Sequence, residues 1–141
     1  MLEPGASWAT VAAAVGDIET MLNKWLSQTH GLGVTDFRAL SLLSEAPDRE
    51  LRITELAKQV GLNQSSTTRL VARIESKGFA MRDTCPDDGR GIYAVITEPG
   101  LELVRTLTEP YNERLGSLVS RMIASDTERN HAFRTVINFR P

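Results

Sequence analysis

Residues 51–97 constrain the fold more than any other part of the chain. A short helical segment at 54–60 is followed by Gly61, and a longer one runs over about 64–77. Gly78 can end the second helix, because glycine readily takes the left-handed conformation found there. Two short apolar strands follow around a glycine-rich loop. Helix, tight turn, helix and β-hairpin is the order of a winged helix-turn-helix.

The longer helix has two different faces. Asn63 is expected to cap it, because its side-chain oxygen can accept an N–H group of the first turn. At ~100° per residue, the side that must face a core consists of Thr67, Leu70, Val71 and Ile74. The opposite side is small, polar and basic, and it consists of Ser65, Arg69, Ala72 and Ser76, flanked by Ser66, Thr68 and Arg73. Hydroxyls and an arginine can bond base edges and phosphates, so this face predicts DNA contact; an ordinary solvated helix face is the alternative.

A β-hairpin is predicted after the helix. Phe79 and Met81 alternate with Ala80 and Arg82, and Ile92, Ala94 and Ile96 alternate with Tyr93 and Val95, a period of two that is typical of half-buried strands. The loop between them is charged and rich in glycine. Arg90 in this loop is expected to enter a narrow minor groove, and Asp88 to orient its guanidinium by a charge-assisted hydrogen bond. A solvated loop with no binding role is the alternative.

Five segments match one protein family in order and spacing. They are ITELA at 53–57, GLNQSSTTRLV at 61–71, IESKGF at 74–79, DGR at 88–90 and ITEPG at 96–100. On these segments the chain resembles the MarR family of bacterial transcriptional regulators. The resemblance covers the whole chain in layout and residues 51–100 in detail.

The resemblance implies a homodimer on pseudo-palindromic double-stranded DNA, with the second helix in the major groove and the wing in the minor groove. It also implies, for many members, release from DNA by a small, often aromatic ligand. The candidate DNA contacts are Gln64, Ser65, Ser66, Thr68, Arg69 and Arg73 on the helix, and Asp88 and Arg90 on the wing. The chain departs from the family pattern at the wing, where Gly89 or Gly91 replaces a common second basic residue and Cys85 a common acidic one.

The expected fold is mainly α with a small β-hairpin wing (α+β), formed by a single MarR-like domain over residues 1–141. Residues 34–97 would be the winged helix-turn-helix part, and 6–29 with 98–138 a helical dimerisation part. Both outer segments are amphipathic, and a compact winged helix needs neither. Their apolar stripes would be covered most simply by the same segments of a second chain.

The first outer helix carries an apolar stripe that runs from Trp8 to Trp25. Two tryptophans on one stripe can anchor a partner surface, and packing within the monomer is the alternative. Thr35 is expected to cap the helix that follows, at about 36–45.

The second outer segment begins with a long helix that Thr97 caps and that ends near residue 122. Pro110 lies inside it and predicts a kink or break near 106–110, because proline removes a backbone hydrogen bond. Residues 125–128 fit a capping box that starts at Ser125 and begins a last helix.

Length and charge limit the class of protein. At 141 residues with 41% hydrophobic residues, the chain suffices for one domain with a core. A net charge of −2 argues against non-specific nucleic-acid coating as the main role. One cysteine excludes an internal disulfide, no signal peptide is visible, and no run approaches ~18 apolar residues, so we expect a cytoplasmic protein without a membrane contact.

Enzymatic chemistry is not indicated, and no metal or cofactor is expected. His30 and His131 are isolated, and Cys85 has no partner at metal-ligand spacing. Two alternatives to a ligand-released DNA-binding repressor remain. Cys85 could act as a thiol-based redox switch if Arg82 or Arg90 lowers its pKa, and a winged helix can also serve as a protein-interaction module without DNA binding.

A crevice for the small aromatic ligand is expected where the dimerisation helices meet the winged part. Its candidate aromatic lining is Trp25, His30, Phe37 and Tyr111. Both the crevice and its ligand follow from the resemblance.

Overall fold

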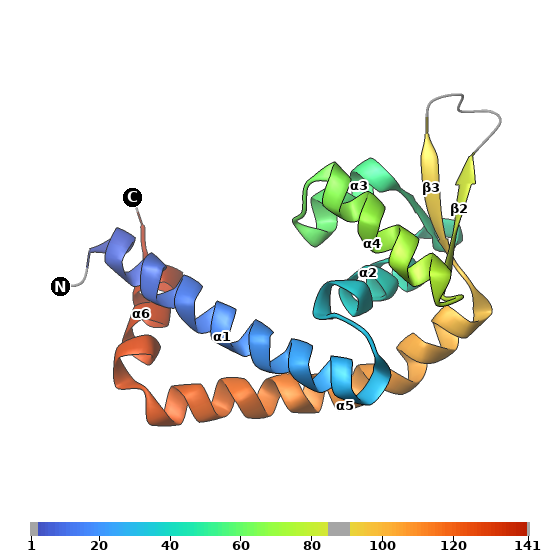
Figure 1. Ribbon diagram of the computed structural model, residues 1–141. Helices are drawn as coiled ribbons and strands as arrows, with labels where there is room; N and C mark the ends of the chain where they lie inside the picture. The colour runs from blue at the N-terminus through green and yellow to red at the C-terminus, as the bar shows by residue number, and fades with distance from the viewer. Residues whose placement is uncertain (1–2, 85–90, 141) are drawn as a thin grey trace. The chain divides into compact units, whose positions relative to one another are not determined.

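The computed structural model describes residues 3–84 and 91–140, and Figure 1 shows its elements in chain order. They are α1 (Pro4–His30), α2 (Val34–Glu45), the 3-10 turn η1 (Pro47–Arg49), β1 (Glu50–Arg52), α3 (Ile53–Val60), α4 (Gln64–Ser76), β2 (Ala80–Thr84), β3 (Ile92–Ile96), α5 (Glu98–Ser125) and α6 (Thr127–Asn138). The chain is mainly helical with one small antiparallel sheet, which confirms the expected fold class. Over the described ranges, no helix combines the length and apolar character that a membrane crossing requires.

The chain forms two compact units. Residues Met1–Gly31 and Glu109–Pro141 make up the helical unit, and Leu32–Thr108 make up the winged unit. Helix α5 contributes to both units and continues through Pro110, so of the kink or break expected near 106–110 the break is absent.

The core of the winged unit holds α4 by one face. Thr67, Leu70, Val71 and Ile74 are all buried, as the helical periodicity predicted. They belong to a core cluster that also includes Ala39, Leu40, Leu43, Ile53, Leu56, Ala80, Ala94 and Ile96. Burying an aliphatic side chain stabilises a fold by roughly 1.5–3 kcal/mol, so the position of α4 is set mainly by this apolar contact.

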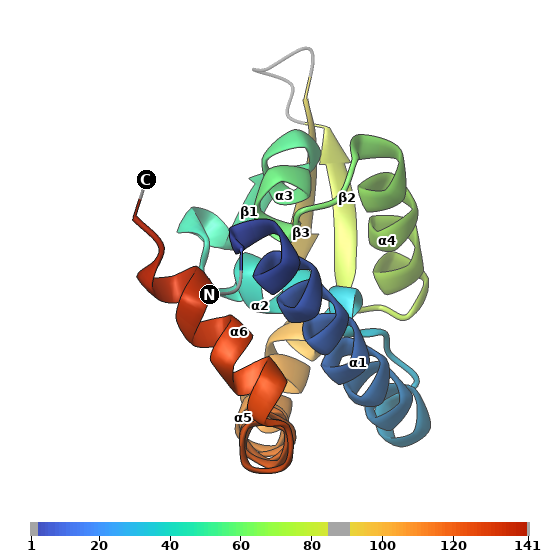
Figure 2. The same cartoon turned by 90° about the vertical axis from the view of Figure 1, so that its left-hand side faces the viewer.

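The wing belongs to a sheet with the strand order β1-β3-β2, in which every pairing is antiparallel. Figure 2 shows the three strands side by side. Strand β3 was predicted with its observed bounds, whereas β1 was not predicted. Residues Glu50–Arg52 form a strand because they pair with Tyr93–Val95, and three residues are too few to show a period of two.

The ends of α4 agree with the prediction, but the caps of two other helices do not. Asn63 Oδ1 accepts the Ser66 N–H at 2.8 Å, and Gly78 has φ 82° after the helix end. Helix α2 begins earlier than expected, after Gly33 rather than Thr35. The reason is that the Asp36 carboxylate accepts the Gly33 N–H from inside the first turn.

The start of α6 also differs by one residue. Asp126, not Ser125, is its N-cap, and its carboxylate accepts the Arg129 N–H at 3.0 Å. A carboxylate at this position bonds an orphan N–H group and also opposes the positive end of the helix dipole.

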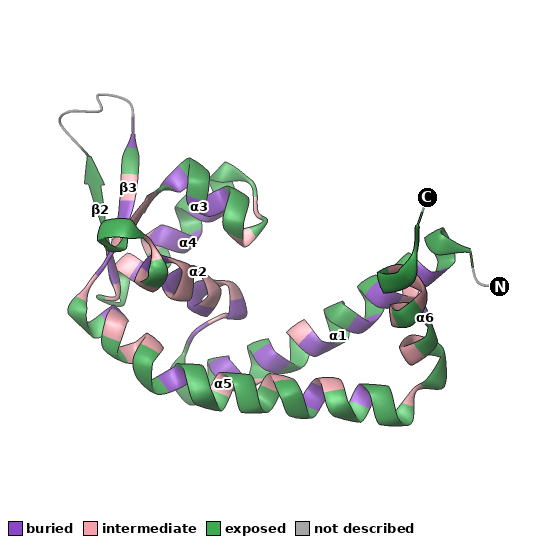
Figure 3. Cartoon of the chain, turned by 180° about the vertical axis from the view of Figure 1, so that it is seen from behind, coloured by how far each residue is buried: buried purple, intermediate pink, exposed green. Residues whose placement is uncertain are grey.

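In the helical unit, α1 packs against α6. Figure 3 shows buried residues recurring along α1, and they are Ser7, Val11, Ala14, Ile18, Leu22 and Leu26. The apolar stripe predicted from Trp8 to Trp25 is therefore only partly internal, since Trp8 is 62% exposed. Arg129 bonds Asp17 of α1 at 2.5 Å, and this hydrogen bond raises the pKa of the guanidinium.

The start of α5 is tied to the end of α4. The Thr97 hydroxyl donates to the Gly78 carbonyl at 2.6 Å and accepts the Gly100 N–H at 3.2 Å. Gly100 lies very close to the backbone of Phe79, the residue before β2. A Cβ at position 100 would be 2.2 Å from the Phe79 carbonyl oxygen and 2.7 Å from Ile96 Cγ1. Only glycine fits this contact without displacement of the backbone.

We predict that Gly100→Ala lowers the free energy of unfolding by about 1–3 kcal/mol, the usual cost of forcing extra atoms into a packed site. Urea denaturation followed by circular dichroism measures this change. Gly16→Ala is the matched control, because a Cβ at position 16 meets nothing within 4 Å and alanine favours the helix. Equal stability of the wild type and Gly100→Ala would contradict the packing described here.

Candidate nucleic-acid interface

The face of α4 opposite the core is exposed. Gln64, Ser65, Thr68, Arg69 and Arg73 are exposed, and Ser66 is partly exposed. Because Thr67, Leu70, Val71 and Ile74 hold the other face, the helix presents these six candidates on one side of the winged unit. This is the arrangement that lets a helix enter a groove of a duplex.

Hydrogen bonds within the helix already orient several of these side chains. The Thr68 hydroxyl donates to the Gln64 carbonyl at 2.9 Å, which leaves its oxygen lone pairs and its methyl group for an outside partner. Arg69 Nη2 donates to Ser66 Oγ at 3.2 Å, so its guanidinium leans toward the start of the helix. The bond is to a neutral hydroxyl and does not neutralise the positive charge of Arg69. This charge can therefore act on an anionic or base-edge partner.

Arg73 has a different environment. Its Nη2 donates to Asp36 Oδ1 at 2.9 Å, and the Asp36 side chain is only 6% exposed. The other oxygen of Asp36 accepts the Gly33 N–H at 3.0 Å. The structure thus joins the last turn of α4 to the first turn of α2, a contact that the sequence did not indicate.

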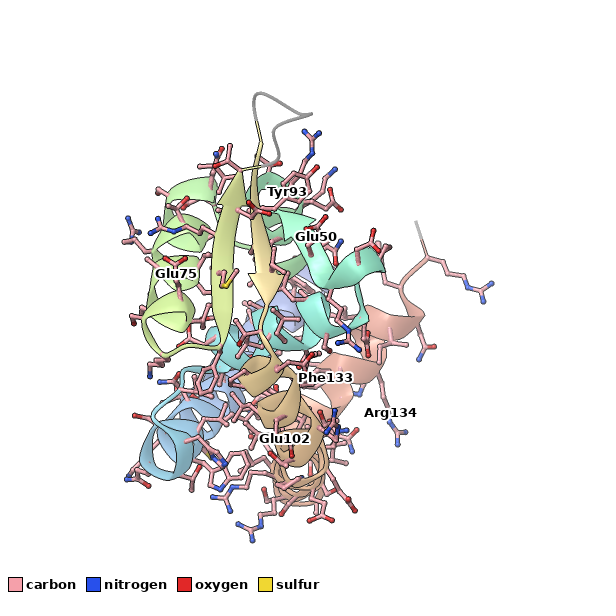
Figure 4. The ribbon with its side chains drawn as sticks, turned by 90° about the vertical axis from the view of Figure 1, so that its right-hand side faces the viewer. Glu50, Glu75, Tyr93, Glu102, Phe133 and Arg134 are labelled. Atoms are coloured by element: carbon pink, nitrogen blue, oxygen red, sulfur yellow. The ribbon has the colours of Figure 1, made fainter. Side chains whose placement is uncertain are left out.

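A second ion pair joins α4 to the wing. Glu75 Oε2 accepts the Arg82 backbone N–H at 2.8 Å, and Oε1 accepts Arg82 Nε at 3.0 Å and lies 2.9 Å from Nη2. Figure 4 shows Glu75 on the side of α4 next to β2. The bond from the Arg82 backbone and those from its guanidinium hold the pKa of the Glu75 carboxyl below its ordinary value of 4.5.

The tip of the wing lies outside the described residues, and with it the predicted contacts Asp88 and Arg90 and the thiol of Cys85. At the end of β3 next to the wing loop, Tyr93 accepts a hydrogen bond on its hydroxyl from Arg52 Nε of β1 at 3.0 Å. The Arg52 guanidinium carbon lies 5.6 Å from the centre of the Tyr93 ring, within cation–π range. Figure 4 shows Tyr93 near the wing end of β3.

The four candidate ligand-crevice residues come from both units. Trp25, His30 and Tyr111 belong to the helical unit, and Phe37 is buried in the winged unit. The rings of Trp25 and His30 meet edge to face with centroids 6.4 Å apart. The crevice itself stays a prediction.

Asp36 and Glu75 are the residues near this interface that sequence reasoning missed. Each is an acidic residue on a helix, and each takes its importance from an arginine on another element. A local signal existed for Asp36 alone, since an acidic residue in the first turn of a helix can bond a free N–H group. Neither arginine partner could be identified from spacing.

Comparison with known proteins gives one consistent result. The model of the MarR family matches residues 32–92. The transcriptional regulator MhqR of Bacillus subtilis is 27% identical over 118 residues, which span 84% of this chain and 79% of the relative. The transcriptional repressor MprA of Escherichia coli is 29% identical over 108 residues, 77% of this chain and 60% of MprA.

Solved structures agree in fold over nearly the whole chain. Sco3205, a MarR family regulator from Streptomyces coelicolor crystallised in complex with DNA, is 27% identical with a TM-score of 0.78. That match covers 97% of this chain and 87% of Sco3205. AbsC, from the same organism, is 25% identical with a TM-score of 0.75, over 93% of this chain and 88% of AbsC.

The Glu75–Arg82 pair predicts a pH dependence of stability. A carboxyl whose pKa is lower in the folded state stabilises the fold above its unfolded pKa, and this contribution is lost as the pH falls through the folded pKa. The stability difference between the wild type and Glu75→Gln should therefore be largest near neutral pH and shrink as the pH falls below 4.5. Urea titrations from neutral pH to below that value measure it.

Glu102→Gln is the control for this prediction, because Glu102 pairs with Arg105 on the surface of a single helix. An i,i+3 surface pair contributes little to stability. A Glu75→Gln difference that does not depend on pH would mean that the ionised carboxylate is not what matters.

Proposed function

We propose that the chain is a transcriptional regulator of the MarR family and that it binds double-stranded DNA sequence-specifically through α4. The observation that carries this proposal is that one face of α4 is buried and the opposite face is exposed. Leu70 and Ile74 are fully buried, whereas Ser65, Thr68 and Arg69 are exposed. Arginine can bond guanine edges bidentately, and a threonine can contact a thymine methyl group. The wing residues Asp88 and Arg90 would add the minor-groove contact.

We also propose that the protein acts as a homodimer on a pseudo-palindromic operator. The helical unit leaves large apolar side chains exposed, among them Trp8, Val15, Ile123 and Ile137, the last at 76%. An apolar groove of about 480 Å³ lies among α1, α5 and α6, and Val15, Ile123, Phe133 and Ile137 line it. The same helices of a second copy would cover this surface and would set two recognition helices ~34 Å apart, or a multiple of that distance.

We further propose that the protein is a cytoplasmic repressor released from its operator by a small aromatic ligand. Its relative MprA is named a transcriptional repressor, and Sco3205 was crystallised with DNA. Of the candidate residues, Trp25, His30 and Tyr111 of the helical unit would supply aromatic surface for the ligand. Release requires that the ligand prefer the arrangement of the helices that does not fit the operator.

Selection of bound sequences from random duplex DNA tests the DNA-binding proposal most directly. The wild type should enrich a two-fold symmetric site. Arg69→Ala should lose ~1 to 3 kcal/mol of binding free energy and relax the preference at one position of each half-site. Titrations with the enriched duplex and its single-base variants measure both effects.

Arg105→Ala is the matched control, because Arg105 is an exposed arginine on α5 that pairs with Glu102. It should leave affinity and specificity unchanged. Failure of the wild type to enrich any sequence at low salt would overturn DNA binding and favour a protein-interaction module.

The dimer predicts a mass near twice that of one chain in sedimentation equilibrium at micromolar concentration. Ile137→Asp should shift this equilibrium toward the monomer, because it puts a charge on the apolar surface. Ala13→Asp is the control, since Ala13 is exposed on α1 and does not line the groove. A monomeric wild type would contradict the proposal.

A further inference from the structure

The buried carboxylate of Asp36 is the starting point. Asp36 is 4% exposed, and a charge removed from water is stable only with good partners. It has two of them: the Gly33 N–H at 3.0 Å and Arg73 Nη2 at 2.9 Å. Gly33 and Asp36 belong to the start of α2, whereas Arg73 lies near the end of α4.

Arg73 is not buried with its partner. Its side chain is 51% exposed, and it follows Arg69 by four residues, which places both on the same face of α4. A guanidinium is planar and has several N–H donors, so one can bond Asp36 while others remain available to a phosphate oxygen. The carboxylate also restricts the rotation of the group that would make this contact.

Stability alone is a poor explanation for this pair. A buried ion pair can often be replaced by apolar side chains of similar volume without loss of stability. An ion pair with one member buried and the other at the proposed DNA surface has a further effect, because it holds a flexible cation in one orientation.

We propose that Asp36 is a positioning residue for DNA binding, which orients the Arg73 guanidinium toward a phosphate of the duplex and holds the last turn of α4 against α2. This inference rests on the proposed function and adds a residue that does not itself touch DNA. The proposal and simple electrostatics predict opposite changes in DNA affinity when the charge of Asp36 is removed. Removal of a negative charge near a DNA-binding surface should raise affinity for DNA, whereas loss of a positioning carboxylate should lower it.

The test is a double-mutant cycle with Asp36→Asn, Arg73→Gln and the double variant, titrated against the duplex that the wild type selects. Arg73→Gln should weaken binding roughly tenfold per half-site for all sequences alike and reduce the salt slope by about 1 per half-site. Asp36→Asn should also weaken binding, and the double variant should bind no more weakly than Arg73→Gln. Circular dichroism at the titration temperature establishes that each variant is folded.

Asp83→Asn is the matched control, because it makes the same chemical change at an exposed position of β2. It should leave affinity unchanged or raise it. Wild-type or tighter binding by folded Asp36→Asn would overturn the proposal, and so would losses that simply add in the double variant.

If Asp36→Asn fails to fold, Arg73→Lys tests the positioning role instead. It keeps a positive charge beside Asp36 but lacks the planar fork, so it should bind DNA almost as weakly as Arg73→Gln. Wild-type affinity of Arg73→Lys would show that only the charge matters and would overturn the positioning role. If the wild type selects no DNA at all, the proposed function fails; if it selects DNA and the cycle is additive, this inference alone fails.

Discussion

The contact on which the winged unit depends is the apolar face of α4 against its core. Leu70, Val71 and Ile74 have no exposed surface, and the same core includes residues of α2, α3 and both wing strands. The burial of these side chains fixes the rotation of α4 about its own axis. Their helical spacing therefore determines which side chains point outward, and a change of one position would turn Arg69 away from the surface.

Polar contacts act on a helix that is already placed. Arg73 of α4 bonds Asp36 of α2, and Glu75 of α4 bonds Arg82 of the wing strand β2. These pairs lie at the same end of α4, while Asn63 caps the opposite end. Apolar burial supplies most of the stabilisation, and the ion pairs give direction to groups that would otherwise rotate freely. The two kinds of interaction are complementary in this unit.

The sequence predicted those parts of the structure that depend on near neighbours. The period of α4, its Asn63 cap and the bounds of β3 all follow from residues within a few positions of one another. Strand β1 was missed because it exists only through pairing with residues about forty positions later. Asp36 was missed as part of the interface for the same reason, since Arg73 is 37 residues away. The exposure of Trp8 was one of two alternatives that the stripe alone could not separate.

The unbroken course of α5 through Pro110 has a mechanical consequence. The proline has no N–H to donate to the Thr106 carbonyl, so the helix lacks one backbone hydrogen bond. That gap lies next to the boundary at Thr108 and Glu109, where the helix passes from one compact unit to the other. A helix that lacks one backbone hydrogen bond bends more easily at that turn than elsewhere. Bending of α5 would then be concentrated in that one helical turn.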